Sequence, residues 1–343
     1  MRAEIRRSSV LSCIALAMGI FACLLTCVMD RPKPARPGEG DGALYRAIYT
    51  RVHEGQNYYD AAHAQLQARH YGLRSVLNWR VPTLTYLLAV PPSPIYARLL
   101  LIVISLVAIL LAVNRLKEGG LSPLLVLVFL LLGSLLSVVF IEAVVFSELW
   151  AGVLILLSIL LYPRHRLLCT LAGLAALFLR ELAAVYVLIL LMRVIYDSFS
   201  AESSRRRLVS TPGAVLMIGL FIYTLIYLWH FHQVQAHILA DDPGYPSGYM
   251  QLLGLPFLLS AARQNIWLML LPMWVTAIYL PVCVYGMFSL PKSIGQLVIP
   301  TVLAYLALFA IAAKPFNDYW GLMISPLLAI SLPAGMVKRK ISP

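Results

Sequence analysis

The chain has 343 residues, of which 61% are hydrophobic and only 12% are charged, and its mean hydropathy is +0.83. This composition excludes an ordinary soluble domain and is typical of a polytopic membrane protein. The formal net charge of +12 comes from basic residues scattered over short loops. This scatter argues against a nucleic-acid partner and favours anionic membrane lipids as the partners of these loops.

Apolar runs long enough to cross a bilayer recur along the chain, and runs this continuous predict helices rather than a barrel. The first, from Ser8 to Val28, follows a basic start and ends at Asp30. No small-residue cleavage site follows it, which favours a retained first helix over a cleaved signal peptide. Since Lys and Arg favour the cytoplasmic side, we expect the N-terminus inside and Asp30 outside. Further helices are predicted over residues 96–113, 121 to about 141, about 149–162, 213–229, 266–288, 297–313 and 321–336.

The segment from Leu167 to Tyr196 is too long for one ordinary span, and both of its flanks are basic. Arg164 and Arg166 precede it, and Arg205–Arg207 follow. Two cytoplasmic flanks require a hairpin of two short helices whose apex is Arg180 and Glu181. Charged groups at such an apex must face a cavity lined by protein or water.

The trace predicts an all-α polytopic fold of roughly ten membrane segments with both termini cytoplasmic. We treat residues 1–343 as one integral-membrane domain. It carries a first external loop with juxtamembrane helices over residues 29–95 and a second large external loop over residues 230–265.

Several common catalytic motifs are absent from the sequence. It contains no Gly-rich phosphate loop ending in Lys and Ser or Thr, no His-Glu-x-x-His, no Gly-x-Ser-x-Gly and no Asp-x-Asp. These absences argue against an ATP-driven pump, a zinc protease, a serine hydrolase and a nucleotide-sugar enzyme. The five cysteines fall in predicted membrane segments, and the histidines match no ligand pattern. We therefore expect no metal and no cofactor.

The first external loop carries Asp41-Gly-Ala-Leu-Tyr45 soon after the first helix and Arg80-Val-Pro82 before the next apolar run. This pattern resembles the first periplasmic loop of the GT-C superfamily of integral-membrane glycosyltransferases, such as lipid A aminoarabinose transferases and protein mannosyltransferases. There, an acidic residue after the first helix precedes Tyr, a short helix ending in Gly, and a basic-Pro-Pro-Leu stretch. Two positions depart from the pattern. Gly42 stands where a second acidic residue is frequent, and Val81 replaces one proline.

The resemblance implies a GT-C-like fold and transfer of a sugar from a polyprenyl-phosphate donor to a lipid, glycan or protein acceptor. The active site would lie on the external face of a bacterial inner (plasma) membrane. It implies Asp41 as the catalytic base and Arg80 and Arg180 as donor-phosphate ligands. A carboxylate can deprotonate an acceptor hydroxyl, and arginines can neutralise the departing phosphate. The further substrate-binding residues that we expect are Tyr45, Glu148, Glu181, Asn317 and Tyr319.

Other interpretations remain open at this point. Asp41 is compatible with a turn residue, Arg80 with an interfacial anchor, and Arg180 with a buried pair to Glu181. A secondary transporter or lipid flippase would also be a helical bundle with charged cavity residues, although no convincing internal repeat is found. A non-catalytic scaffold would leave Asp41, Arg80 and Arg180 without a shared cavity.

Overall fold

The computed structural model describes residues 2–28, 39–200, 211–244 and 251–337. Within these ranges the chain is helical, and the β pairing there is limited to an isolated bridge between Gln251 and Ala313. Asp30, Arg205–Arg207 and the basic C-terminal Lys338–Lys340, on which part of the predicted topology depends, lie outside the described residues.

The described residues form α-helices joined by loops and short 3-10 turns. The α-helices are α1 (Arg2–Val28), α2 (Asp41–His53), α3 (Tyr58–Ala68), α4 (Thr83–Ala89), α5 (Ile95–Leu116), α6 (Leu121–Leu135), α7 (Ser147–Leu161), α8 (Arg166–Leu179), α9 (Ala184–Ser200), α10 (Thr211–His237), α11 (Gly254–Ala262), α12 (Ile266–Met269), α13 (Met273–Gly286), α14 (Lys292–Ile311) and α15 (Ser325–Met336). The 3-10 turns are η1 (Val76–Asn78), η2 (Lys117–Gly119), η3 (Leu136–Val139), η4 (Ile141–Val145), η5 (Glu181–Ala183), η6 (Met287–Ser289) and η7 (Asp318–Met323).

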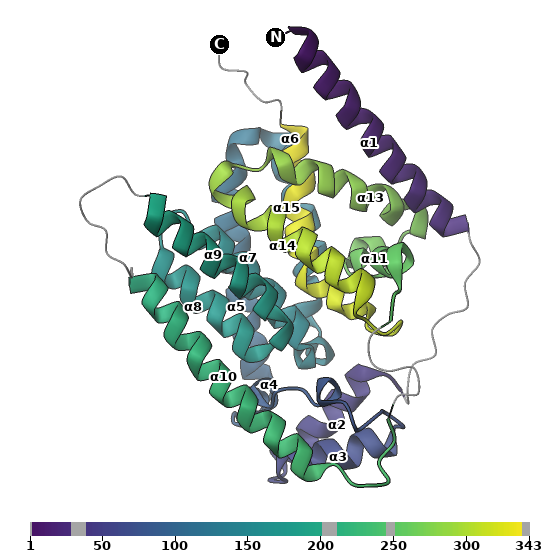
Figure 1. The fold of residues 1–343 in the computed structure, drawn as a ribbon, viewed down its shortest axis with the longest axis vertical. Coiled ribbons are helices and arrows are strands. Elements are labelled where there is room, and N and C mark those ends of the chain that lie inside the picture. The colour runs from purple at the N-terminus through teal and green to yellow at the C-terminus, as the bar shows by residue number, and fades with distance from the viewer. Residues whose placement is uncertain (1, 29–38, 201–210, 245–250, 338–343) are drawn as a thin grey trace.

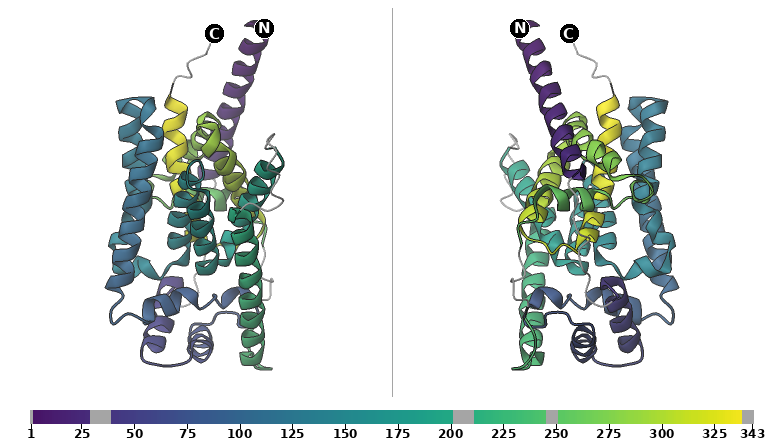
Figure 2. Two further views of the ribbon diagram at one scale, coloured as in Figure 1. Left: turned by 90° about the vertical axis from the view of Figure 1, so that its left-hand side faces the viewer. Right: turned by 90° about the vertical axis from the view of Figure 1, so that its right-hand side faces the viewer.

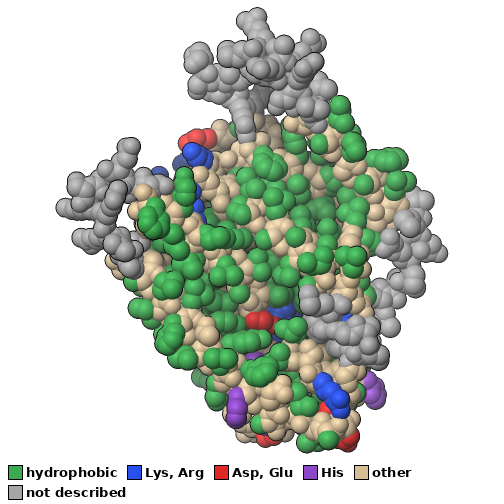
Figure 3. Space-filling model, in the orientation of Figure 1, with side chains coloured by type: hydrophobic (Ala, Val, Ile, Leu, Met, Phe, Trp, Pro, Cys, Tyr) green, Lys and Arg blue, Asp and Glu red, His purple; other side chains and the backbone are tan. Residues whose placement is uncertain are grey.

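Five helical stretches in the described residues are long and apolar enough to cross a membrane, which indicates a membrane protein. They are Ile95–Gly119, Leu121–Val139, Glu181–Phe199, Thr211–His237 and Lys292–Ile311. Five shorter apolar helices, in α1, α7, α8, α13 and α15, occupy the other predicted segments. The all-helical class is therefore confirmed, whereas the ten spans and the GT-C fold stay predictions. Figure 3 shows hydrophobic side chains over the middle of one face, as a surface in contact with lipid requires.

The helices form a bundle with a separate layer at one end. In Figure 1, α2 and α3 lie at the lower end, and the start of α1 and the end of α15 lie at the upper end. The two side views of Figure 2 show the same separation. Helix α7 is the centre of the bundle, because almost all of its side chains are buried and it packs on α5, α8 and η7. Its first residues, Ser147 and Glu148, lie beside Tyr45 and Arg80 of the lower layer.

Two glycines let η7 lie against its neighbours at backbone contact. A Cβ on Gly152 of α7 would lie 2.3 Å from the carbonyl oxygen of Leu322, and a Cβ on Gly321 would lie 1.9 Å from that of Ala261 in α11. Any larger residue would have to push these backbones apart. The glycines thus fix η7, and with it Tyr319 and Trp320, between α7 and α11.

The break between α8 and α9 falls where the sequence predicts the hairpin apex. Arg180 has an extended backbone, with φ −147° and ψ 114°, and ends α8, while η5 begins at Glu181. The two helices pack on each other and on α10. The local hairpin is present in the structure, and its orientation in the membrane stays a prediction.

Other predicted boundaries shift for identifiable reasons. The predicted helix 266–288 is split into α12 and α13 before Pro272, because proline cannot continue a helical ladder and disfavours helix in the residue before it. Helix α10 continues past Trp229, where the predicted helix ends, to His237. This extension is held by α3, since the Tyr59 hydroxyl and His230 Nδ1 lie 3.0 Å apart.

Candidate functional site

The first loop folds as a small layer with its own core, which positions the candidate residues. Its buried core contains residues of α2, of α3 and of the loop that follows them, namely Leu44, Ile48, Tyr58, Leu66 and Trp79. The indole of Trp79 donates to the Leu73 carbonyl oxygen at 2.8 Å. The Tyr58 hydroxyl donates to the Arg80 carbonyl oxygen at 2.5 Å. The core of this layer therefore fixes the backbone at Arg80, immediately before α4.

Asp41 is the first residue of α2, and both of its carboxylate oxygens accept hydrogen bonds. The Tyr71 hydroxyl donates to Oδ1 and the Tyr319 hydroxyl donates to Oδ2. The N-terminal end of a helix also favours a negative charge. Among the described residues, Asp41 has no ion-pair partner within 4.0 Å. The carboxylate is thus held by two neutral donors from η7 and from the loop after α3.

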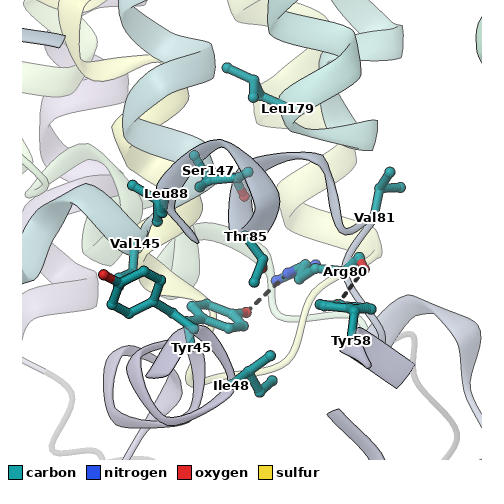
Figure 4. Close-up of a pocket in the computed structure, with 12 residues that line it drawn as sticks. Tyr45, Ile48, Tyr58, Arg80, Val81, Thr85, Leu88, Val145, Ser147 and Leu179 are labelled. Carbon is teal, nitrogen blue, oxygen red and sulfur yellow. Dashed lines mark hydrogen bonds between the residues drawn. The ribbon is translucent and has the colours of Figure 1, made fainter. Parts of the chain in front are cut away.

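Arg80 connects the layer to the bundle through its guanidinium group. Its Nε donates to the Tyr45 hydroxyl at 3.0 Å, and its Nη2 donates to the Tyr319 hydroxyl at 3.0 Å. Its Nη1 donates to Glu181 Oε1 at 3.1 Å, and Nη2 lies 3.5 Å from Glu148 Oε1. Figure 4 shows Arg80 between Tyr45 and Tyr58. The Arg80 side chain is 13% exposed, so it is the accessible cation of the cluster.

Arg180 and Glu148 form the interior half of the cluster, and both side chains are fully buried. Arg180 Nε lies 2.8 Å from Glu148 Oε1, and Nη1 donates to Glu181. The guanidinium lies over the Trp320 ring, 5.7 Å from its centroid. Arg180 Nη2 has no hydrogen-bond partner among the described residues. Two arginines therefore face two glutamates in a charge-balanced group that retains one unused buried donor.

Burial controls the protonation of the two tyrosines in the network. It raises the pKa of the Tyr319 hydroxyl well above its usual value, and the negative charge of Asp41 adds to the shift. Burial also raises the pKa of Tyr45, with Arg80 opposing and Asp41 assisting. Burial acts to lower the pKa of Arg80, but Tyr45, Tyr319 and the two glutamates raise it above its usual range. Both hydroxyls therefore stay neutral beside a charged guanidinium.

Two cavities flank this network. The larger, of about 450 Å³, is bordered by Asp41 and Tyr319. Its other polar lining includes Arg46, Glu142 and Asp318, and its aromatic lining includes Phe140, Phe146 and Phe316. The smaller, of about 20 Å³, lies between α2, α4 and α7 and includes Tyr45, Arg80 and Ser147 (Figure 4). A space of that size suits one water molecule. Asp41 thus faces a space that a small organic group fits.

The structure brings together almost all of the residues singled out from the sequence. Asp41, Tyr45, Arg80, Glu148, Arg180, Glu181 and Tyr319 form one connected set of hydrogen bonds and ion pairs. Asn317 is buried two residues before Tyr319, where its backbone bonds Lys314 and Trp320. The scaffold interpretation, in which Asp41, Arg80 and Arg180 share no site, is not favoured by this geometry. Their catalytic and phosphate-binding roles stay predictions.

Sequence reasoning missed Tyr71 and Trp320 as partners of the charged groups, and it missed Arg46 as a cavity residue. Two histidines instead tie α3 to the end of α10 and to the loop after it. His63 Nε2 lies 3.0 Å from Asp242 Oδ2 in that loop, and His237 Nε2 lies 3.5 Å from Asp60 Oδ1. In the described part of the chain, no group of three or more His, Cys, Asp or Glu side chains is arranged to hold a metal ion.

Comparison of the chain with protein-family models, with curated proteins and with solved structures finds no match.

Proposed function

We propose that the protein is a membrane glycosyltransferase of GT-C type, which transfers a sugar from a polyprenyl-phosphate donor to an acceptor on the external face. One observation carries the proposal. The Asp41 carboxylate borders a cavity of about 450 Å³ and is joined through one tyrosine hydroxyl to Arg80, at the end of an apolar bundle. A base, a cation and an apolar wall are the three features that this chemistry needs.

The reaction assigns a part to each side of the network. An acceptor hydroxyl in the larger cavity gives its proton to Asp41 while its oxygen bonds the anomeric carbon of the sugar. The bond between that carbon and the phosphate oxygen breaks, and the electron pair leaves with the polyprenyl phosphate. Arg80 is the accessible cation that faces this new negative charge. The lipid needs no nucleotide pocket, in keeping with the missing nucleotide motifs.

Arg180 takes a supporting part in this proposal. It is fully buried, whereas Arg80 is not, and it holds Glu148 and Glu181. With these carboxylates also neutralised by Arg180, Arg80 can exchange a contact for a phosphate oxygen without leaving either glutamate unpaired. Direct contact between Arg180 and the donor phosphate would use Arg180 Nη2. It would also require the buried Arg180–Glu148 pair to separate.

The test replaces Asp41 by Asn, which keeps the side-chain shape but removes its ability to accept a proton. Purified Asp41→Asn protein, given a polyprenyl-phosphate sugar and candidate acceptors, should lose about a hundredfold to ten-thousandfold in transfer rate while still binding donor. Glu54→Gln is the matched control, since Glu54 is an exposed carboxylate at the end of α2 outside the network. Turnover by Asp41→Asn equal to that of Glu54→Gln would exclude Asp41 as the base.

A second arm addresses the donor. Arg80→Gln removes one charge-assisted contact to phosphate, which is worth about 1.5 to 3 kcal/mol, so donor affinity should fall by at least about tenfold. Donor binding unchanged in a folded Arg80→Gln protein would remove Arg80 from the phosphate site.

A further inference from the structure

Four arginines gather at the end of the bundle that lies away from α2 and α3. Arg115 lies in the last turn of α5, Arg164 lies in the turn between α7 and α8, Arg166 begins α8, and Arg193 lies on α9. We call this set the inner arginine cluster. These positions follow from chain connectivity, because α5, α7 and α9 all begin near the lower layer and run toward the upper end in Figure 1.

One carboxylate serves two of these arginines. Asp197 Oδ2 lies 2.9 Å from Arg166 Nη2, and Asp197 Oδ1 lies 2.5 Å from Arg193 Nη2. The Tyr162 hydroxyl also donates to Asp197 Oδ2, at 2.6 Å. The Asp197 side chain is only 10% exposed, so the arrangement is built into the α8 and α9 contact. Two guanidinium groups are therefore fixed in place by a single negative charge.

The other two arginines add positive charge without a compensating carboxylate. Among the described residues, neither Arg115 nor Arg164 lies within 4.0 Å of an acidic group, and their two charges repel each other. Arg164 is exposed, and Arg115 lines a cavity of about 430 Å³ between α5, α6 and α15. Glu118 borders the same cavity. The inner arginine cluster thus keeps a surplus of positive charge, which an anion would relieve.

The surface beside the inner arginine cluster is apolar and exposed. On α8, Leu168 is 51% exposed, and on α9, Met192 and Phe199 are 61% and 84% exposed. An exposed apolar surface on membrane helices faces hydrocarbon. An anion that fits both the arginines and this surface therefore has its charged group next to acyl chains. Guanidinium groups match phosphate geometry, and basic pockets between membrane helices suit lipid head groups.

We propose that the inner arginine cluster binds the phosphate of an anionic phospholipid, in the leaflet nearer this end of the bundle. Arg115 and Arg164 supply the uncompensated charge, and Arg166 presents its exposed guanidinium from the Asp197 pair. The exposed side chains of α8 and α9 contact the acyl chains. The site is separate from the Asp41 network and does not depend on the proposed glycosyl transfer.

The test compares spin-labelled phosphatidylglycerol with spin-labelled phosphatidylcholine at the full-length protein in phosphatidylcholine vesicles. Electron paramagnetic resonance gives the fraction of each label immobilised by the protein, and hence a relative association constant. The wild-type protein should prefer phosphatidylglycerol. Arg115→Gln combined with Arg164→Gln should lower that preference by about fivefold for each arginine removed. These two substitutions leave the ion pairs of Asp197 with Arg166 and Arg193 intact, so we expect the variant to fold.

Arg98→Gln is the control, because Arg98 lies on the same helix α5 at its opposite end. It should retain the wild-type preference. Equal association of the two lipids with wild-type protein, or equal loss in the Arg98→Gln protein, would overturn the proposal. Inorganic phosphate, added at matched ionic strength, should leave the lipid preference unchanged. Displacement of phosphatidylglycerol by inorganic phosphate would instead identify a site for a soluble anion.

Discussion

The buried pair of Arg180 and Glu148 allows a quantitative test of the site's architecture. In the native cluster, two arginines balance two glutamates. Arg180→Met leaves Glu148 and Glu181 to share Arg80, from which they lie 3.5 Å and 3.1 Å away. Removing one partner of a buried ion pair typically costs about 3 to 5 kcal/mol, because the remaining charge stays buried. We expect Arg180→Met to lower the free energy of unfolding by about that amount.

Removing the charge of the acidic partner, Glu148, should lower the free energy of unfolding by less. Glu148→Gln leaves Arg180 paired with Glu181 and keeps a side-chain oxygen that accepts hydrogen bonds. We expect a loss of about 1 to 3 kcal/mol, in the range for a hydrogen bond to a charged group. The double variant restores charge balance with one arginine and one glutamate. Its loss should therefore be smaller than the sum of the single losses, by about 2 kcal/mol.

The assay is equilibrium unfolding in mixed micelles titrated with sodium dodecyl sulfate and followed by circular dichroism. Arg98→Met, near the start of α5, is the control outside the network. Arg98 is half-buried and its Nη1 donates to the Val139 carbonyl oxygen at 3.3 Å, so this change should cost only about 0.5 to 1.5 kcal/mol. The reasoning fails if Arg180→Met costs no more than Arg98→Met. It fails equally if the losses from Arg180→Met and Glu148→Gln add fully, because the two side chains would then not be coupled.

Two further predictions concern η7 and Tyr319. Gly321→Ala should lower stability by about 1 to 3 kcal/mol and reduce sugar transfer, because its Cβ would lie 1.9 Å from the Ala261 carbonyl oxygen and displace Tyr319. Gly295→Ala in α14, whose Cβ would meet Leu290 at an ordinary 3.6 Å, should be neutral or stabilising in the same unfolding assay. Since burial raises the pKa of Tyr319, the unfolded chain ionises first, and stability should fall as the pH rises above the usual tyrosine pKa of about 10, by up to about 1.4 kcal/mol per pH unit. A pH titration of unfolding should show a smaller alkaline loss in Tyr319→Phe than in wild type, and equal losses would exclude a buried neutral hydroxyl.

The sequence was sufficient for the class of fold and for the place of the hairpin break. Long, continuously apolar runs must form helices in lipid, because only a helix satisfies all of their backbone polar groups. A segment with basic residues on both flanks cannot be a single span. Arg180 and Glu181 were found because ions are rare inside apolar segments. Asp41 and Arg80 were found because a polar loop stands out in so apolar a chain and holds few residues that can act as a base or bind phosphate. These are features of composition and spacing, which a sequence displays directly.

Which side chains of the site contact one another could not be predicted from composition and spacing. That Glu148 meets Arg180 depends on how α7 packs on α8, and that Tyr319 meets Asp41 depends on Gly152 and Gly321 admitting η7 between two helices. Tyr71 lies in an irregular stretch without periodicity, so nothing local connects it to Asp41. Pro272 alone predicts the break between α12 and α13. The sequence analysis nevertheless predicted one continuous helix there, because the residues on both sides of the proline are apolar.

Tyr319 also explains how one site can keep a base and a cation close together. Direct pairing of Asp41 with Arg80 would stabilise the ionised carboxylate and would occupy the guanidinium. In the structure the Tyr319 hydroxyl stands between them, donating to Asp41 and accepting from Arg80. Arg180 and the two glutamates balance the remaining charge behind it. On the proposed mechanism, the carboxylate therefore takes the acceptor proton on the cavity side, and the guanidinium exchanges one of its present contacts for the departing phosphate.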